Sequence, residues 1–292
     1  MPHPSLITQA QALLDQAGVS DGSVLHAPSG VHLLRHHQVT LQDMTLYQPL
    51  LCLVLQGAKE VGTPMRSLHV GREQSLLVSH TVPVTSRITL ADAQQPYVAL
   101  VLPLDLALLR ELAPSAPLTT SQASSNPFSI SLCPLDELLQ AALSRYLQQT
   151  QSPATHSLLA PITLREIHAR LLLGPHGPLL QKLLWQETTA HRVFKATQHI
   201  QANLANPIVI ADLAQQVGMS SSAFFEHFKA VTGTSPLQYQ KDLRLLRARD
   251  ALRSSKGRVS EIAFDVGYDN PAQFSREFAR KFGHTPRQDR GG

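Results

Sequence analysis

The sequence predicts an α+β protein with an N-terminal antiparallel β-barrel or sandwich, a helical segment behind it and an all-α C-terminal region. Three observations lead to this prediction. Short apolar segments separated by turn residues occupy residues 30–103. Apolar residues recur at helical spacing between residues 135 and 172, and one short helical motif occurs twice near the C-terminus. We therefore expect a β-rich domain joined to a helical one.

Length and charge both favour two domains. A chain of 292 residues is long enough for two cores, and we expect domains at 1–180 and 181–292. Residues 1–189 hold 10 Lys or Arg and 12 Asp or Glu, whereas residues 190–292 hold 15 and 9. A basic C-terminal third attached to a nearly neutral remainder is typical of a DNA-binding module joined to another domain.

The composition also bears on the cellular setting. The longest clean apolar stretch, Leu50 to Leu55, is far shorter than the ~18 residues that a membrane span needs. The N-terminus lacks a basic region followed by an apolar core, so we expect no signal peptide. Cys52 lies in an apolar run and is predicted to be buried; with Cys133 it provides neither a disulfide framework nor a four-cysteine zinc site. We expect a cytoplasmic protein without membrane contact.

The predicted strands are short apolar segments punctuated by glycine and proline. They are Val31–Leu34, Leu50–Leu55, Ser67–Val70, Ser75–Val78, Thr85–Leu90 and Tyr97–Leu102. Strands of this length and spacing indicate a small antiparallel barrel or sandwich. Because both faces of the strand from Leu50 are apolar, one face should line the barrel interior and the other should lie under helices.

Helical periodicity follows the strands. Leu104–Leu112 predicts a short helix, Ala113–Pro127 and Asn126–Pro134 predict loops, and two apolar stripes predict longer helices. The stripes are Leu135, Leu138, Leu139, Ala142, Leu143 and Tyr146, then Ile162, Ile167, Leu171 and Leu172. Either stripe could pack on its own barrel, but we favour an antiparallel helical dimer contact. Leu173–Pro178 interrupts the pattern, and we expect the interdomain connection to begin there.

The C-terminal duplication indicates two helix–turn–helix units. Asp212–Gly218 corresponds to Glu261–Gly267, and the downstream residues Phe224, Phe228, Gly233 and Pro236 recur as Phe274, Phe278, Gly283 and Pro286. The phenylalanines stand four residues apart and so share the core face of each second helix. We expect units at about 208–232 and 258–282, joined by a basic helix at about 236–254, with the opposite faces of the second helices free to enter DNA major grooves.

These motifs resemble a known family. The run from about Val193 to Arg287, with Gly218-Met219-Ser220, Gly233-Thr234-Ser235-Pro236 and Val266-Gly267-Tyr268, is similar to the DNA-binding domain of AraC/XylS transcription regulators. The segment Gln48–Glu60 resembles the cupin-like N-terminal barrel of one AraC type. The resemblance implies a cupin-like barrel that senses small molecules, a helical dimerisation segment and a double helix–turn–helix domain.

The resemblance also implies which residues face DNA. In the second unit these are Asn270, Gln273, Ser275 and Arg276, of which Arg276 can fork onto guanine and Gln273 can pair with adenine. In the first unit they are Ser221, Ser222, Phe225, Glu226 and Lys229. Arg244, on the helix between the units, is expected to contact phosphate.

A small-molecule pocket and a metal site are the alternatives for the barrel. Gln56 ends its strand beside Gly57 at the expected barrel mouth, where Tyr47, His36 or His80 could join it around an effector; alternatively Gln56 caps a turn. A metal-binding cupin needs two histidines one residue apart, and this chain offers only His69, Glu73 and His80. We therefore expect no metal and no cofactor.

The sequence thus predicts a DNA-binding transcription regulator, not an enzyme. The expected partners are double-stranded DNA, a small-molecule effector, a second copy of the chain and, if the protein is an activator, RNA polymerase. Three alternatives stay open: a metal-dependent cupin enzyme fused to a DNA-binding module, a DNA-repair methyltransferase, which would need cysteine ligands and a reactive thiol, and an architectural DNA binder without an effector. The sequence does not decide between activation and repression.

Overall fold

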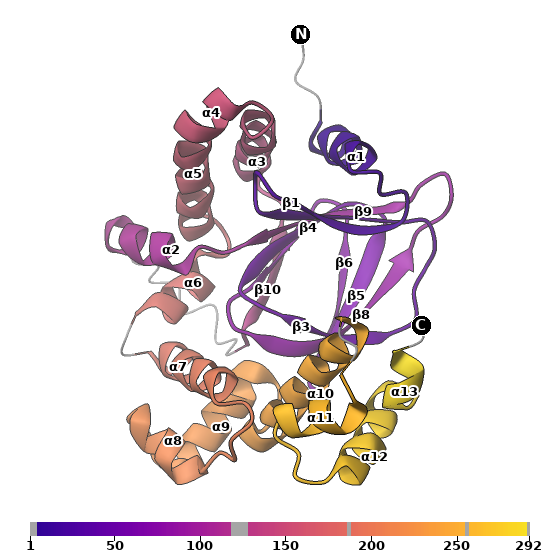
Figure 1. Cartoon of the computed structure of the whole chain (residues 1–292). Helices are drawn as coiled ribbons and strands as arrows, with labels where there is room; N and C mark the ends of the chain where they lie inside the picture. The colour runs from indigo at the N-terminus through magenta and orange to yellow at the C-terminus, as the bar shows by residue number, and fades with distance from the viewer. Residues whose placement is uncertain (1–4, 118–127, 186–187, 255–256, 291–292) are drawn as a thin grey trace.

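The computed structural model describes residues 5–117, 128–185, 188–254 and 257–290. Its strands form two antiparallel sheets that face each other (Figure 1). The six-stranded sheet has the order β1-β2-β9-β4-β7-β10, and the four-stranded sheet has the order β3-β8-β5-β6. The strands are β1 (Gly22–His26), β2 (Val31–His36), β3 (Asp43–Tyr47), β4 (Leu50–Gln56), β5 (Ala58–Thr63), β6 (Arg66–Gly71), β7 (Gln74–Val78), β8 (Val82–Leu90), β9 (Tyr97–Pro103) and β10 (Ile130–Pro134).

Strand β4 is buried on both faces, as its sequence predicted. Leu51, Leu53 and Leu55 join the core between the six-stranded sheet and the helices. Cys52 and Val54 join the core between the two sheets. Cys52 is fully buried, which confirms that expectation. The central strand therefore ties the two apolar layers of the N-terminal region together.

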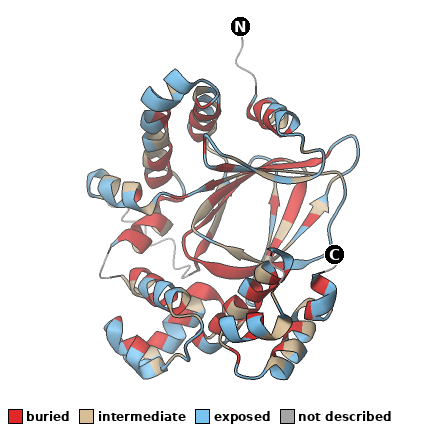
Figure 2. Cartoon of the chain, in the orientation of Figure 1, coloured by how far each residue is buried: buried red, intermediate tan, exposed pale blue. Residues whose placement is uncertain are grey.

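Helices cover the outer face of the six-stranded sheet (Figures 1 and 2). The helices that bury residues in this core are α1 (Leu6–Gln16), α2 (Leu106–Leu112), α3 (Glu137–Gln149), α5 (Ala160–Leu173) and α6 (Gly177–Leu184), with a 3-10 turn at Ala113–Ser115. Helix α4 (Pro153–Leu158) has no buried residue and packs on α5. Most of each apolar stripe packs on the chain's own sheet through Leu139, Leu143, Ile167 and Leu171. The predicted boundary at residue 180 falls inside α6 and stays a prediction.

Several elements differ from the sequence prediction. The expected loop at Asn126–Pro134 is wrong for residues 130–134, because Ile130–Pro134 forms β10 and pairs with β7; its beginning lies outside the described residues. Strands β1, β3 and β5 and helix α1 were not predicted, although Asp43–Tyr47 alternates polar and apolar residues and Leu6, Ala10 and Leu13 of α1 have helical spacing. Leu138 and Ile162, placed in the apolar stripes, are exposed by 60% and 65%.

In its described residues, the C-terminal region consists of helices joined by loops. Its helices are α7 (Thr189–Ala202), α8 (Ile210–Gln216), α9 (Ser221–Thr232), α10 (Pro236–Ser254), α11 (Val259–Asp265), α12 (Pro271–Phe282) and α13 (Pro286–Asp289). Two apolar cores form, one around Phe224 and Phe228 and one around Phe274 and Phe278. All four rings are fully buried, which confirms the core face predicted from the duplication.

Helix α10 connects the two cores and also packs on the N-terminal sheets through β3 and β8. The Tyr239 hydroxyl donates to the Thr81 carbonyl at 2.7 Å, and the Arg249 guanidinium lies 2.6 Å from the Asp43 carboxylate.

No helix in the described ranges combines the length and apolar character needed to cross a membrane.

Candidate nucleic-acid interface

The second unit presents α12 as its outward helix. Because Phe274 and Phe278 occupy the core face, Gln273 and Arg276 point outward, and both are exposed. Asn270 caps the helix, with its side-chain oxygen accepting from the backbone of Ala272 and Gln273. Thus Arg276 and Gln273 are available for base contacts, whereas Asn270 positions the helix start.

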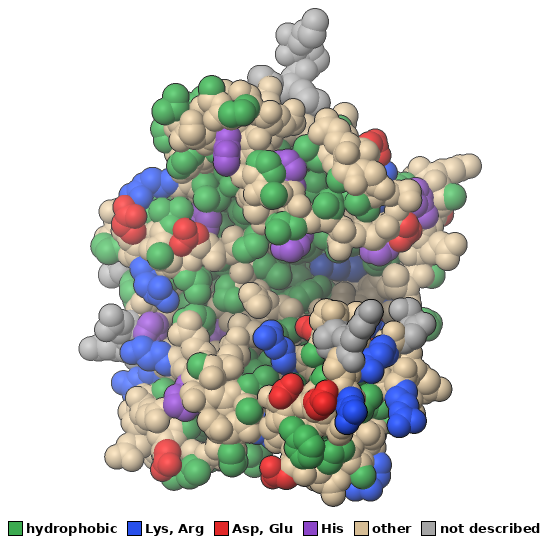
Figure 3. Space-filling model, viewed as in Figure 1, with side chains coloured by type: hydrophobic (Ala, Val, Ile, Leu, Met, Phe, Trp, Pro, Cys, Tyr) green, Lys and Arg blue, Asp and Glu red, His purple; other side chains and the backbone are tan. Residues whose placement is uncertain are grey.

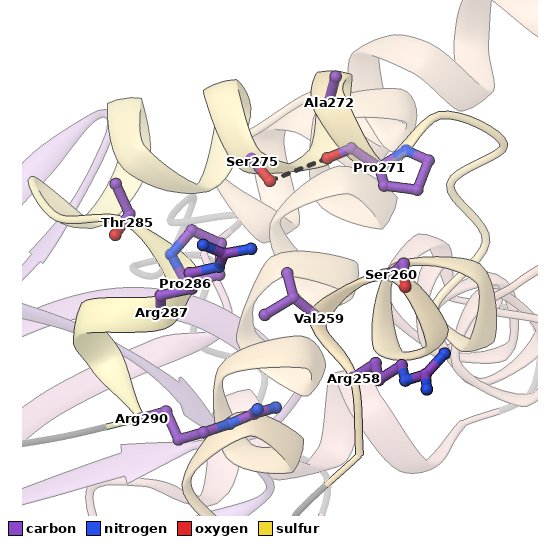
Figure 4. Close-up of a pocket in the computed structure, with 10 residues that line it drawn as sticks. All are labelled: Arg258, Val259, Ser260, Pro271, Ala272, Ser275, Thr285, Pro286, Arg287 and Arg290. Carbon is purple, nitrogen blue, oxygen red and sulfur yellow. Dashed lines mark hydrogen bonds between the residues drawn. The ribbon is translucent and has the colours of Figure 1, made fainter.

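A basic groove runs along one flank of α12 (Figure 4). It encloses about 780 Å³ and is lined by Arg258, Val259 and Ser260 at the start of α11, by Pro271, Ala272 and Ser275 of α12, and by Thr285, Pro286, Arg287 and Arg290 around α13. Ser275 lies on this flank and donates to the Pro271 carbonyl at 2.9 Å, so it contributes a helix-bound hydroxyl to the wall.

Three arginines give this groove its positive charge. Figure 3 shows Lys and Arg side chains gathered at the α12 and α13 end of the molecule. Arg258 and Arg287 are exposed, and Arg290 donates to the Gly257 carbonyl. These arginines were not predicted from the sequence, because only the packing of α13 against α12 brings their distant positions together. Such a positively charged groove is suited to bind the backbone of a polyanion.

The other flank of α12 is an ion-paired surface. Lys241 lies 2.7 Å from Glu277, and Lys281 lies 2.8 Å from Asp242. Burial alone would raise the pKa of Glu277, but hydrogen bonds from Lys241 and Tyr268 hold that pKa below its ordinary value. The carboxylate is therefore charged at neutral pH and offsets Lys241. This flank is closer to neutral than the arginine groove.

Arg244 has different partners from those predicted. Its guanidinium donates to the carbonyls of Leu204, Ala205, Asn206 and Gly267 at 2.9–3.2 Å. These bonds clamp the loop after α7 to the turn of the second unit. The phosphate contact of Arg244 stays a prediction, and these four bonds show that most of the guanidinium hydrogens are directed into the protein.

The first unit presents a less basic face. All five residues that the sequence analysis assigned to it are exposed on α9: Ser221, Ser222, Phe225, Glu226 and Lys229. Ser220 caps the helix by accepting from the backbone of Ala223. Lys229 is the cation of this set and Glu226 opposes it. The structure therefore gathers the predicted residues of the first unit on one surface, with a weaker positive charge than the second unit carries.

The four effector candidates do not converge on one pocket in the described structure. His36 lies 2.9 Å from Asp21, and the Gln56 amide donates to the Pro96 carbonyl, as a turn-capping residue does. Tyr47 contacts Lys59 and Ser86. His80 is buried between the two regions, where its ring contacts Phe194 and donates to the Ala190 carbonyl. Burial lowers the pKa of His80 to about 4, so the ring is neutral at pH 7.

Comparison with known proteins decides the family. Residues 27–179, just over half of the chain, match the AraC-type transcriptional regulator N-terminus, and residues 213–292 match a helix-turn-helix domain. The chain belongs to the AraC family of transcription regulators. This is a family of transcription regulators and not of enzymes.

Relatives extend this assignment. The chain is 29% identical over 135 residues to the HTH-type transcriptional regulator ExsA of Pseudomonas aeruginosa, covering 46% of this chain and 48% of ExsA. It is 28% identical over 155 residues to the HTH-type transcriptional activator RhaS of Escherichia coli, covering 53% of this chain and 55% of RhaS. The chain thus spans about half the length of these relatives.

Solved structures show the same fold over nearly the whole chain. An apo structure of ToxT from Vibrio cholerae superposes with a TM-score of 0.58 at 9% identity, covering 92% of this chain and 97% of ToxT. A second ToxT structure, with unsaturated fatty acid bound, superposes with a TM-score of 0.50 at 10% identity, covering 88% of this chain and 91% of ToxT. The AraC-family fold, two sheets followed by a helical DNA-binding region, is confirmed.

Proposed function

We propose that a small molecule bound by the N-terminal sheets controls how this AraC-family regulator occupies its operator. One observation carries the proposal: the four-stranded sheet packs directly, through β3 and β8, on the helix that joins the two helix–turn–helix units. Arg249 of that helix is 5% exposed and is held by Asp43 and by the Met44 carbonyl. A change in the sheets therefore reaches the DNA-binding units without any further partner.

Further contacts support this coupling. His80 donates to the Ala190 carbonyl before the first unit, and the backbone of Ser129 donates to the Val231 carbonyl at the end of α9. Leu46 of β3 packs into the core of the first unit. The ToxT structure with a bound fatty acid adds a precedent for ligand binding within this fold.

The mechanism is a shift between conformations. An effector that binds one arrangement of the sheets and helices more tightly raises its population by the ratio of its two affinities. If that arrangement sets the spacing of α9 and α12, operator affinity changes by the same coupling free energy. The rod-like α10 would hold the two helices in successive major grooves, which lie ~34 Å apart on one face of the duplex.

Base readout is assigned to the outward residues of α9 and α12, with Arg276 and Gln273 as the specific contacts. Phosphate contacts are assigned to Arg258, Arg287 and Arg290 in the groove beside α12. Arg244 is assigned a structural role. Since the second unit carries more exposed positive charge at its helix, it should supply more of the sequence-independent affinity.

A homodimer is the proposed assembly. Leu158, Leu159 and Ile162, at the end of α4 and the start of α5, are exposed apolar residues, between 44% and 72% accessible. A second copy docking through this face would bury them and bring two DNA-binding regions together. The proposal also includes action in the cytoplasm and contact with RNA polymerase. It further includes activation of transcription, which the name of RhaS states for that protein.

The test uses the full chain. Binding sites are selected from random duplexes, and affinity for the selected site is then measured across salt concentrations and against a metabolite library. We expect affinity to fall steeply with salt and at least one metabolite to change operator affinity several-fold while raising the melting temperature. If every metabolite leaves operator affinity unchanged, the architectural alternative without an effector is the correct one.

A further inference from the structure

Arg244 links the two helix–turn–helix units at a point beside α10. Its guanidinium donates to the carbonyls of Leu204, Ala205 and Asn206, in the loop between α7 and α8, at 2.9–3.2 Å. It also donates at 2.9 Å to the carbonyl of Gly267, in the turn between α11 and α12. One side chain therefore holds the loop that leads into the first unit against the turn of the second.

The loop that Arg244 holds is fixed to the first unit by its own contacts. Leu204 packs against the core that contains Phe224 and Phe228. The side chain of Gln240, a residue that is 5% exposed, donates to the carbonyls of Leu204 and Asn206 at 3.2 and 2.6 Å. Because Gln240 lies in the part of α10 that packs on this first core, the loop moves together with the first unit.

The backbones of the loop and the second turn approach closely at Gly267. A Cβ on this glycine would lie 2.4 Å from the carbonyl oxygen of Ala205 and 2.7 Å from its Cα, so a larger residue would push the two segments apart. Gly267 also has a φ of 95°, which glycine adopts without steric cost. The second turn is therefore shaped to contact the first unit.

The matching turn of the first unit provides an internal comparison. Gly218 holds the equivalent position, and its carbonyl accepts from Arg192 of α7 at 2.8 Å. The atom nearest to a Cβ on Gly218 would be Nη1 of Arg192, at 3.7 Å. Each turn is thus held by an arginine from the helix that precedes its unit, and Arg244 differs from Arg192 because it also bonds to the loop of the other unit.

This second attachment restricts how the units can move relative to each other. Helix α10 enters the first core with Tyr239 and Leu243, and the second core with Leu245, Ala248 and Leu252. Packing along a single helix would allow a unit to rotate slightly about the axis of that helix. The Arg244 clamp joins the units at a point off this axis, and so opposes the rotation.

We propose that Arg244 is a positioning residue that fixes the separation of α9 and α12, and thereby determines the spacing of the two base segments in the operator. The inference rests on the proposed reading of successive major grooves by these two helices. One base pair changes the distance between two segments by about 3.4 Å and rotates one relative to the other by about 35°. Two helices held at a fixed separation cannot follow this change, so one of them loses its base contacts.

The experiment measures the affinity of the full chain for its selected operator and for two altered duplexes. These carry one base pair more or one fewer between the segments that α9 and α12 of one protomer read. The parent should bind the altered duplexes on the order of tenfold more weakly, because base contacts of one unit are lost. Arg244→Met, which keeps an apolar stem but removes the four bonds, should show a penalty about threefold smaller.

Two further variants complete the test. Arg192→Met removes the corresponding bond to the first turn without touching the contact between the units, so it should keep the full spacing penalty of the parent. Gln240→Met releases the same loop without any change of charge, and it should reduce the penalty as Arg244→Met does. Melting curves report the folded fraction of each variant, and Gln240→Met decides the test if Arg244→Met is unfolded at the assay temperature.

The ratio of affinities separates positioning from other roles of Arg244. A side chain that served only stability, or only a phosphate contact, would change the affinity for all three duplexes alike. An unchanged spacing penalty in folded Arg244→Met would therefore overturn the inference, and so would an equal reduction of the penalty in Arg192→Met.

Failure of the inference is distinguishable from failure of the proposed function. If the parent shows the spacing penalty and the variants show it equally, the clamp does not set the spacing, and the reading of two grooves stands. If the parent itself binds all three duplexes alike, α9 and α12 do not read one site together, and the proposed reading is wrong along with the inference.

Discussion

The surroundings of each arginine determine its role in this protein. Arg276 is exposed on the outer face of α12. In contrast, Arg244 donates to backbone carbonyls, and Arg253 pairs with the buried Asp289 at 2.8 Å. Hydrogen bonds from Arg253 and His284 hold the Asp289 pKa below its ordinary value, although burial by itself would raise it. The arginines of one basic region therefore divide into those that are exposed and those whose donors are used within the protein.

Arg276→Ala should weaken binding to the selected operator by ~1–3 kcal/mol and relax the choice of one or two bases, because a bidentate guanine contact is lost. Arg287→Ala is the matched comparison from the groove. It should weaken binding to all duplexes alike and reduce the salt slope by about 1. Titrations against operator and random DNA at several salt concentrations check both. Equal losses on the two DNAs for Arg276→Ala would show that this side chain contacts only the backbone.

Arg244→Ala should lower the melting temperature and leave base preference unchanged. The change removes the donors for four carbonyls that now hold the loop after α7 against the second unit. Thermal unfolding and the selected-site profile together measure this. A variant that melts like the parent but loses salt-dependent affinity would restore Arg244 as a phosphate contact.

At the scale of elements, the two units repeat one packing arrangement. Each outward helix begins at a side-chain cap, Ser220 or Asn270, and ends at a left-handed glycine, Gly233 or Gly283. Only glycine adopts that backbone conformation without steric cost. The turn between α11 and α12 (266–270) is one residue longer than the turn between α8 and α9 (217–220), and this extra residue leaves the packed faces in register.

Phe228→Ala and Phe278→Ala should each cost ~3–5 kcal/mol of unfolding free energy, because both rings are fully buried. Phe225→Ala provides the control, since Phe225 lies on the same helix as Phe228 but is 45% exposed. It should change stability far less. Urea unfolding of the three variants tests the assignment, and a Phe228→Ala curve that overlays that of Phe225→Ala would contradict the helix register.

At the scale of the whole molecule, buried histidines join distant segments. His80 bonds to the Ala190 carbonyl, and His176 bonds to Ser75 and Ser131 of strands β7 and β10. Burial lowers the pKa of each ring to about 4, so both are neutral in the folded protein at pH 7. These contacts connect the sheets to the helices that precede the first DNA-binding unit.

Stability should fall between pH 7 and pH 5. Below pH 6.5 the unfolded chain protonates these histidines while the folded protein does not, so folding loses free energy until the pH reaches about 4. The loss at pH 5 should be about 2 kcal/mol for each ring. His80→Gln, which keeps an amide donor for the Ala190 carbonyl, should reduce this dependence. Urea unfolding at both pH values measures it, and an unchanged pH dependence in the variant would show that His80 does not contribute.

The sequence by itself determined the family, the fold class and the two helix–turn–helix units. These features rest on local patterns: the repeated phenylalanines, the turn glycines and the alternation of Leu50 to Leu55. Local patterns survive in sequence because each residue's face is set by its neighbours three or four positions away in a helix, or two away in a strand. The predicted residues of α9 and the outward residues of α12 lie where that periodicity placed them.

Only the tertiary structure decided how residues distant in sequence meet. Several contacts join segments whose separation in the sequence carries no periodic signal. They are the contact of Lys59 with Cys52, the ion pair of Arg249 with Asp43, the hydrogen bond of His80 to Ala190, and the groove that Arg258 and Arg287 line together. The same holds for the clamp by Arg244, whose sequence pattern is that of a surface arginine on a basic helix. In the folded protein each of these side chains contacts one partner out of many residues of the same type. The folded topology determines which partner that is, and local spacing in the sequence does not encode it.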